Sequence, residues 1–248
     1  MKIILLGTGD ATGTPKIGCN CPTCRDAYNG SKSNRLRFSV LVESKEGKVL
    51  IDTSPDMRLQ LIRKGIDYID GVIWTHAHYD HYSGFGDFHR IQSKVKVYGL
   101  SYTLDYILNY LYFMKPVRHD VIFYEPFKLI GLEFTLFEVS HPPLKESAGV
   151  LIRYGNKKVV ITGDTTKQIP EKSIEIMKNA DVLIADAIFP PDYKVLKHMN
   201  SMEATELAKE LKAKKTIFTH ISHIFPPHDI AVKKWPLGYD NMEIKIGV

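Results

Sequence analysis

Six consecutive residues, 76 to 81, combine side chains that are able to bind metal ions. They read His-Ala-His-Tyr-Asp-His, so four of the six positions carry an imidazole or a carboxylate. His76 and His78 are two residues apart, and on an extended backbone their side chains point the same way. Asp80 and His81 follow where the chain enters a glycine-containing segment. This spacing predicts that one short peptide serves two adjacent metal ions.

Hydrolysis by two metals places the ions about 3.5–4 Å apart, so more ligands must converge than the motif supplies. A hydrophobic run at 71–74 precedes the motif and predicts a buried strand that ends at it. Three later hydrophobic runs also end near a ligand-type residue, at His141, Asp164 and His220. α/β architectures place their chemistry at the carboxyl ends of strands. We therefore expect these three residues to complete the site, whose imidazoles and carboxylates suit zinc, manganese or iron.

A second cluster of ligand-type residues is formed by Cys19, Cys21 and Cys24, in a loop rich in glycine and proline. A tetrahedral zinc ion held by three thiolates needs one further ligand. His223 is the best candidate, because it follows His220 by three residues and one turn could direct the two imidazoles to different sites. The pattern thus predicts a structural zinc. Reactive thiols, buried thiols and a disulfide within the loop are the alternatives.

Ten apolar runs rich in Val, Ile and Phe predict strands that position these residues. They are 2–6, 38–43, 48–51, 71–74, 95–98, 132–139, 148–153, 158–162, 181–185 and 215–219. Helices are expected at 56–64, 170–179 and 201–213, the last with a capping box formed by Asn200 and Glu203. Two runs of strands, each followed by helices, predict a layered α/β fold. An α/β sandwich with helices outside two packed sheets fits this order, but other layered α/β folds fit it as well.

The segment 98–114 is a further expected helix, and it is unusually rich in tyrosine. Tyrosines recur at 98, 102, 106 and 110, a spacing of four that drifts slowly around a helix. The first interpretation is a helix packed on the core with its phenol groups reaching solvent. A homodimer surface and a wall of the active site are the alternatives.

The composition fits one domain spanning 1–248, because 248 residues with 44% hydrophobic content can bury a large core. Lys and Arg number 33 against 28 for Asp and Glu, and they are scattered, which favours a small anionic substrate over nucleic acid. The apolar runs are too short for a signal peptide or a membrane span. An odd number of cysteines favours a reducing compartment, so we expect a cytoplasmic enzyme that does not bind membranes.

The motif at 76–81 resembles the His-x-His-x-Asp-His signature of the metallo-β-lactamase superfamily at every defined position. The resemblance implies an αββα sandwich with two divalent ions, zinc or manganese, in the active site. The implied ligands are His76, His78 and His141 for one ion, Asp80, His81 and His220 for the other, and Asp164 for both. Asp52 matches the acid that orients a ligand histidine, although a turn or helix N-terminal role for it is an equal alternative.

Three segments narrow the resemblance to the phosphoribosyl cyclic phosphate phosphodiesterases of phosphonate breakdown. They are the run 7–15, the cysteine loop with its structural zinc, and Thr219–His223. The resemblance implies an enzyme that opens small cyclic phosphate esters by attack of a hydroxide bridging two metals. Asp80 and His198 are the expected catalytic residues, with His198 assisting the phosphate and the leaving group.

Other functions fit the sequence less completely. The chain also resembles the tRNA 3′-processing endonucleases, but it shows no long inserted arm for gripping tRNA, and its cysteine loop replaces their signature. True β-lactamases are a poorer match, since many of them carry a cysteine at the second metal. A thioester or lactone hydrolase is the third candidate. The full ligand set disfavours a binding protein without catalytic activity.

Overall fold

The computed structural model describes residues 1–92 and 94–247. The strands of the first sheet are β1 (Lys2–Gly7), β2 (Ser39–Glu43), β3 (Lys48–Ile51), β4 (Gly71–Ile73), β5 (Lys96–Gly99), β6 (Val117–Asp120) and β13 (Met242–Lys245). Those of the second are β7 (Pro126–Leu129), β8 (Leu132–Glu138), β9 (Ala148–Tyr154), β10 (Lys157–Ile161), β11 (Val182–Asp186) and β12 (Thr216–Thr219). The helices are α1 (Pro22–Tyr28), α2 (Met57–Lys64), α3 (Tyr79–Tyr82), the 3₁₀ helix η1 (Ser83–Arg90), α4 (Ser101–Tyr110), α5 (Glu171–Met177), α6 (Ser201–Glu210) and α7 (His228–Ala231).

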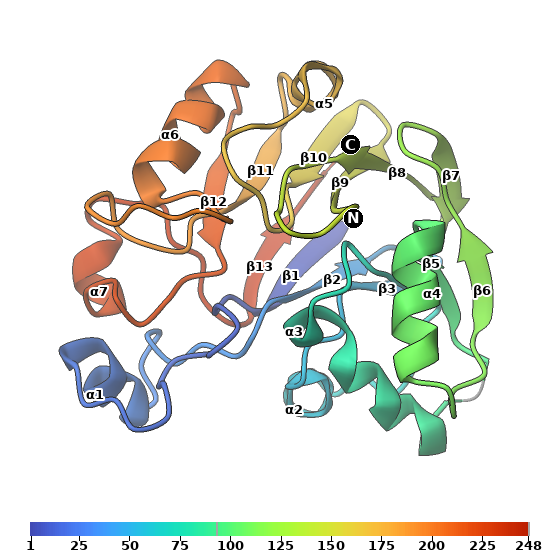
Figure 1. Ribbon diagram of the computed structural model, residues 1–248, viewed down its shortest axis with the longest axis horizontal. Helices are drawn as coiled ribbons and strands as arrows, with labels where there is room; N and C mark the ends of the chain where they lie inside the picture. The colour runs from blue at the N-terminus through green and yellow to red at the C-terminus, as the bar shows by residue number, and fades with distance from the viewer. Residues whose placement is uncertain (93, 248) are drawn as a thin grey trace.

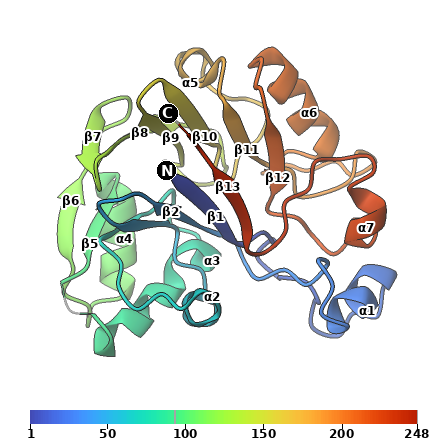
Figure 2. The ribbon, with the colours of Figure 1, turned by 180° about the vertical axis from the view of Figure 1, so that it is seen from behind.

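The two sheets pack face to face with helices on their outer faces (Figure 1). The first has the order β13-β1-β2-β3-β4-β5-β6 and the second the order β12-β11-β10-β9-β8-β7. Figure 2 shows β1 and β13 side by side, where they pair antiparallel. This arrangement is the expected αββα sandwich, so the predicted fold class is confirmed.

Alternation along the strands builds three apolar layers, because successive side chains of a strand point to opposite faces. Val40 and Val42 of β2 lie in the core between the sheets, whereas Leu41 packs beneath the helices of the first sheet. In β9, Ile152 faces the other sheet and Leu151 faces the helices on the outer side. Each sheet is therefore buried on both faces, which explains why its central strands read as continuous hydrophobic runs.

Parallel strands bring the ends of several elements to one edge. β3, β4 and β5 run parallel in the first sheet, and β10, β11 and β12 run parallel in the second. At this edge the N–H of Ala148 donates to the carbonyl of Thr75 over 3.0 Å, which ties the two sheets together. Side chains that follow different strands can therefore meet there.

The ten predicted strands are confirmed, with no end shifted by more than one residue. Three more strands, β6, β7 and β13, were not predicted, nor were α1, α3, η1 and α7. The expected helix at 98–114 is shorter, because Tyr98 and Gly99 complete β5 and the helix ends at Tyr110. The capping box of α6 is present, with Asn200 and Glu203 each bonded to the other's backbone N–H. None of the helices in the described residues is both long and apolar enough to cross a membrane.

Candidate dinuclear metal centre

The motif at 76–81 lies where the first sheet meets the second. β4 ends at Ile73, the chain stays extended through His78, and α3 begins at Tyr79. The structure then brings the later candidates to this point, each from a strand end of the second sheet. Two groups result, in each of which the ligand atoms lie within 4.8 Å of one another. The first is His76, His78, His141 and Asp164, and the second is Asp80, His81, His220 and Asp164.

Asp164 is the carboxylate that the two groups share. Its Oδ2 lies 3.2 Å from Nε2 of His81, 3.3 Å from that of His220, 3.7 Å from that of His76 and 3.8 Å from that of His141. Burial opposes ionisation of Asp164, but His220 and His81 outweigh it and hold the pKa of the carboxyl well below its ordinary value. The centre of the cluster is therefore an anionic oxygen surrounded by imidazoles.

Hydrogen bonds behind the histidines fix their orientation. Asp52 is fully buried, and its Oδ2 accepts from Nδ1 of His81 over 2.7 Å. It also accepts from the N–H and the hydroxyl of Thr75, whose Oγ1 lies 2.9 Å from Nδ1 of His76. Since that hydroxyl proton is given to Asp52, the network assigns the Nδ1 proton to His76. Both histidines thus turn Nε2 toward Asp164, and a metal ion held there would replace any proton on that nitrogen.

His141 is oriented in the same way by the backbone. Its Nδ1 donates to the carbonyl of Lys197 over 2.7 Å, which leaves Nε2 facing the cluster, 2.9 Å from Nδ1 of His78. Burial lowers the pKa of His78 to about 4, with His141 adding to the effect, so His78 is neutral near pH 7 and carries one ring proton. In the absence of metal that proton can lie on Nδ1 and be donated to His141, and a metal ion held by both nitrogens would replace it.

Unpartnered nitrogens show that the cluster fits metal ions. Among the described residues, Nε2 of His76, Nε2 of His81 and both ring nitrogens of His220 are buried without a hydrogen-bond partner. Leaving such groups unsatisfied is costly in a folded protein. All three Nε2 atoms converge on one carboxylate, and this set of nitrogen and oxygen donors suits divalent ions of intermediate softness.

Two residues of the cluster have strained backbones. Asp52 and His220 both have φ of 59°, a left-handed conformation that residues other than glycine rarely adopt. Each follows the last residue of its strand, β3 or β12, so this conformation turns the chain at the strand end. Strain of this kind is concentrated at functional sites.

His198 lies at the rim of the same cluster. Its ring stacks on His220 with 4.8 Å between centroids, and its Nδ1 lies 2.8 Å from Oδ2 of Asp186. Asp186, the last residue of β11, was not assigned a role from the sequence. Asp186 has the same sequence pattern that identified His141, Asp164 and His220 as candidates, namely a ligand-type residue at the end of a hydrophobic strand.

The three cysteines and His223 meet at a separate place, next to α1. Sγ of Cys19 and Sγ of Cys21 lie 3.4 and 3.5 Å from Nδ1 of His223, and all four ligand atoms lie within 4.8 Å of one another. The cysteines are free thiols. Burial raises the pKa of Cys24 to about 12, so this sulfur needs a nearby cation to become a thiolate. The sequence predicted that all three cysteines lie in a loop. In the structure this loop ends at Cys21, the N-cap of α1, and Cys24 lies within the helix.

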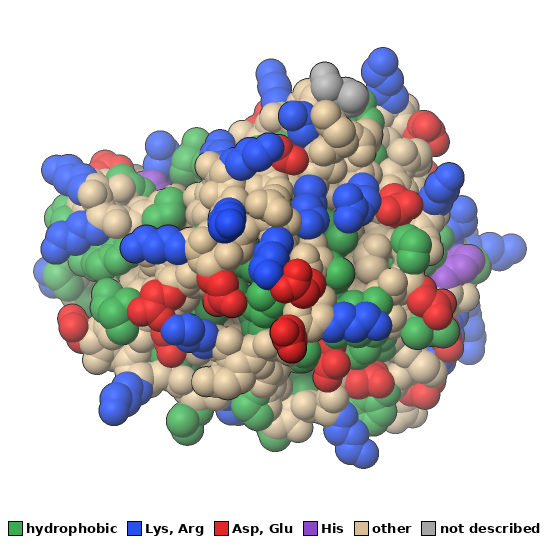
Figure 3. All heavy atoms as spheres, turned by 90° about the horizontal axis from the view of Figure 1, so that it is seen from above, with side chains coloured by type: hydrophobic (Ala, Val, Ile, Leu, Met, Phe, Trp, Pro, Cys, Tyr) green, Lys and Arg blue, Asp and Glu red, His purple; other side chains and the backbone are tan. Residues whose placement is uncertain are grey.

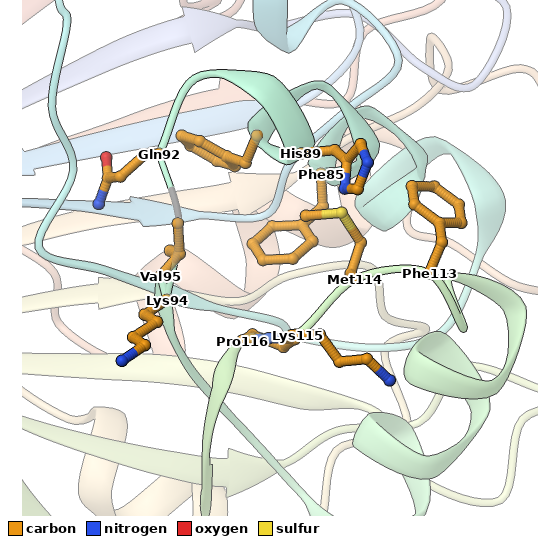
Figure 4. Close-up of a pocket in the computed structure, with 10 residues that line it drawn as sticks. Phe85, His89, Gln92, Lys94, Val95, Phe113, Met114, Lys115 and Pro116 are labelled. Carbon is orange, nitrogen blue, oxygen red and sulfur yellow. The ribbon is translucent and has the colours of Figure 1, made fainter.

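An apolar cavity of about 310 Å³ lies elsewhere, between η1 and the segment that follows α4 (Figure 4). Phe85, Phe88, Phe113 and Met114 line it, with His89 at its side. None of the residues predicted for either metal site lines this cavity.

Comparisons with known proteins agree with this geometry. A family model described as a beta-lactamase superfamily domain matches residues 48–221. An octanoyltransferase of Porphyromonas gingivalis is 30% identical over 98% of this chain, although the chain spans about half (51%) of that relative's length. A probable metallo-hydrolase of Bacillus subtilis, YhfI, is 25% identical over 86% of this chain and 88% of its own.

Solved structures show the same likeness over the full chain. A diphosphatase of the PhnP family superposes with a TM-score of 0.88 at 30% identity, covering 100% of this chain and 98% of that one. Zinc-bound PqqB of Methylobacterium extorquens gives 0.80 at 19% identity, covering 99% of this chain and all of the other, which shows the shared fold. This chain therefore belongs to the metallo-β-lactamase superfamily, in which it is PhnP-like.

Proposed function

We propose that this protein is a metal-dependent phosphodiesterase that hydrolyses small phosphodiesters, cyclic phosphates above all. The observation that carries the proposal is the position of Asp164, whose carboxylate is shared by two groups of three ligand-type residues. The 30% identity to a diphosphatase along the whole chain supports chemistry at phosphorus. The hydrolase fold itself follows from the superfamily.

The proposed ligands are those that the cluster brings together. His76, His78 and His141 would hold one divalent ion, Asp80, His81 and His220 the other, and Asp164 both. When bound, the two ions would polarise the phosphoryl oxygens and make water a nucleophile at neutral pH. Zinc and manganese both suit these donors.

The protein's own contribution is to hold these ligands rigidly. Asp52 fixes His81 directly and His76 through Thr75, so one buried carboxylate orients a ligand of each group. Partners of this kind determine which nitrogen faces the metal and how basic it is. This double role favours the orienting function of Asp52 over a simple turn.

His198 would deliver a proton to the leaving oxygen. Asp186 accepts the Nδ1 proton, so the opposite nitrogen, Nε2, is the atom that can carry the transferred proton. When the ester P–O bond breaks, the leaving oxygen takes the proton from Nε2 and becomes a hydroxyl group, which in a cyclic ester stays attached to the product. Because a ribose alkoxide is a poor leaving group, general acid catalysis of this kind is valuable.

The surface charges support a small substrate. Lys and Arg number 33 against 28 for Asp and Glu and are scattered along the sequence, and the face shown in Figure 3 carries side chains of both signs. Binding of a nucleic-acid duplex depends on many Lys and Arg contacts to consecutive phosphates. A single phosphodiester needs only the cluster itself.

We also propose that Cys19, Cys21, Cys24 and His223 hold a structural zinc ion. Three sulfurs and one imidazole nitrogen make a closed tetrahedral set, without a free position for substrate. The site joins α1 to the turn that begins at His220, so it would stabilise one edge of the dinuclear cluster.

A panel of substrates tests the function. It contains bis-nitrophenyl phosphate, nitrophenyl phosphate as a phosphomonoester, cyclic ribose phosphates, nucleoside cyclic phosphates, a dinucleoside diphosphate, precursor tRNA and a thioester. We expect the small phosphodiesters to be cleaved fastest, and phosphomonoesters poorly, since their additional charge resembles the product. Preferential cleavage of precursor tRNA or of the thioester would refute the proposal.

A further inference from the structure

A group of exposed tyrosines borders the histidine motif. Tyr79 stands between His78 and Asp80 in the sequence, yet 57% of its surface is exposed. Tyr102, Tyr106 and Tyr110 recur every four residues on α4, and they are 43%, 53% and 56% exposed. We call these four residues the tyrosine patch. α4 packs on the core through Thr103, Leu104 and Ile107, as the first interpretation of this segment predicted, and it leaves its exposed tyrosines accessible to a ligand.

A buried tyrosine connects α3, which carries Tyr79, to α4, which carries the other three tyrosines of the patch. Tyr82 on α3 is only 3% exposed, and its ring meets those of Tyr106 and Tyr110 edge to face, with centroids 6.3 and 5.5 Å apart. Tyr79 lies on the same short helix, three residues before Tyr82. α3 and α4 thus form one aromatic surface, and they lie side by side in Figure 1.

The tyrosine patch lies at the edge of the sheets that carries the metal ligands. α4 follows β5, which runs parallel to β4, and the N–H of Trp74 donates to the carbonyl of Tyr98 just before the motif. From the other side, Lys145 follows His141 by four residues, and its Nζ lies 5.6 Å from the ring centroid of Tyr102. The patch is therefore bounded by two segments that carry proposed ligands.

We propose that the tyrosine patch is a subsite for the base of a nucleotide-containing phosphodiester. This inference rests on the proposed function, and it names the part of the substrate that lies beyond the reacting phosphate. Exposed aromatic rings bind the flat face of a nucleobase by stacking, with little preference among bases. Lys145 adds a cation at the same border, suited to an anionic group beside the base.

A pair of substrates that differ only in the base tests this. We would compare adenosine 2′,3′-cyclic phosphate with the 2,3-cyclic phosphate of methyl riboside, which has no base. Tyr79→Leu and Tyr106→Leu should lower the preference for the nucleotide, measured as a ratio of kcat/KM, about tenfold each, mainly through KM. Tyr106→Trp should retain the preference, because it keeps an aromatic ring.

The control is Tyr68→Leu, which alters an equally exposed tyrosine (56%) in the segment between α2 and β4, away from the patch. It should leave the preference unchanged. If the ratio is the same in Tyr79→Leu, Tyr106→Leu and the wild type, the inference is wrong. It is also wrong if these variants change the sedimentation coefficient and not KM, since the patch would then be an interface between copies of the chain.

A binding measurement separates this inference from the proposed function. If the wild type cleaves neither these two substrates nor any other phosphodiester of the panel, the proposed function fails, and calorimetry then compares adenosine 5′-monophosphate with ribose 5-phosphate. We expect the nucleotide to bind about tenfold more tightly, and Tyr106→Leu to remove the difference. Equal binding of the two ligands to the wild type would overturn the subsite.

Discussion

His198 and Asp186 form a pair in which Nδ1 of the imidazole lies 2.8 Å from Oδ2 of the carboxylate. The carboxylate is itself held in place, because the N–H of Thr165 donates to the same oxygen over 3.1 Å. The loop that carries His198 is thus fixed to the end of β11. This pair supplies a proton donor beside the cluster that is not among the proposed metal ligands.

His198→Ala should therefore slow catalysis without removing metal. The loss should be roughly 10²–10⁴-fold for esters with alkyl leaving groups, the usual scale of general acid catalysis. A nitrophenolate leaves without such assistance, so bis-nitrophenyl phosphate should be affected much less. Steady-state kinetics on both ester types, together with elemental analysis, measures the effect.

Asp186→Asn tests whether the carboxylate acts through His198. If the two residues act as one unit, the double variant Asp186→Asn with His198→Ala should be no slower than His198→Ala alone. Equal losses of His198→Ala on both ester types would instead assign this histidine to phosphate binding. Loss of metal would make it a ligand.

Asp52→Asn should weaken metal binding about 10- to 100-fold, the scale found when a partner of a ligand histidine is altered. Asparagine tolerates the left-handed backbone at this position, so the substitution removes the negative charge without adding backbone strain. Competition with a chelator measures the affinity. Asp70→Asn is the matched control, since that carboxylate accepts from the N–H of Lys48 at the other end of β3. Equal affinities in the two variants would argue for a turn role of Asp52.

Cys21→Ser should remove one metal equivalent and lower the melting temperature by roughly 5–10 °C, because zinc bound by thiolates contributes directly to folding. Asn20→Ser changes the adjacent exposed residue and should leave both quantities unchanged. A full metal complement with an unaltered melting temperature in Cys21→Ser would rule out the structural zinc.

Lowering the pH should reduce the free energy of unfolding through His228, a buried histidine that is not a proposed metal ligand. Its Nδ1 lies 3.0 Å from Nη2 of Arg35, which can only donate, so this nitrogen must stay unprotonated. Burial and then Arg35 lower its pKa to about 4 in the folded state, against about 6.5 in the unfolded chain. Between these two pKa values the unfolded chain binds more protons than the folded protein, which favours unfolding. The contribution of neutral His228 to the free energy of unfolding is therefore complete above about pH 6.5 and is lost as the pH falls toward 4.

Urea unfolding at about pH 7 and pH 5 measures this change, which should be on the order of 1 kcal/mol. His228→Gln should reduce it, whereas His89→Gln, which alters an exposed histidine, should not. An identical pH dependence in His228→Gln and the wild type would contradict the assignment.

The sequence allowed most of the cluster to be proposed because its members follow hydrophobic strands. His141, Asp164 and His220 each stand at the end of such a run, and the fold brings these ends together. Asp186 carries the same signal, but an aspartate at a strand end is also common in turns. Only the parallel pairing of β11 with its neighbours places it beside His198.

The strands that could not be predicted lie at the edges of the sheets. β13 and β6 are the two ends of the first sheet, and β7 is one end of the second. β6 reads Val-Arg-His-Asp and is largely exposed, and β7 begins with a proline. Edge strands pair on one side only, so polar residues and proline are tolerated there and the hydrophobic signal is weak.

Counting the metals in Asp164→Ala tests the central claim most directly, because this residue alone belongs to both groups of ligands. Elemental analysis of the purified wild type should find more than two metal equivalents per chain. Asp164→Ala should lose two of them and keep the one that the cysteines hold, with phosphodiesterase activity abolished. A variant that retains every equivalent of the wild type, or a wild type with no metal beyond the cysteine site, would contradict the dinuclear centre.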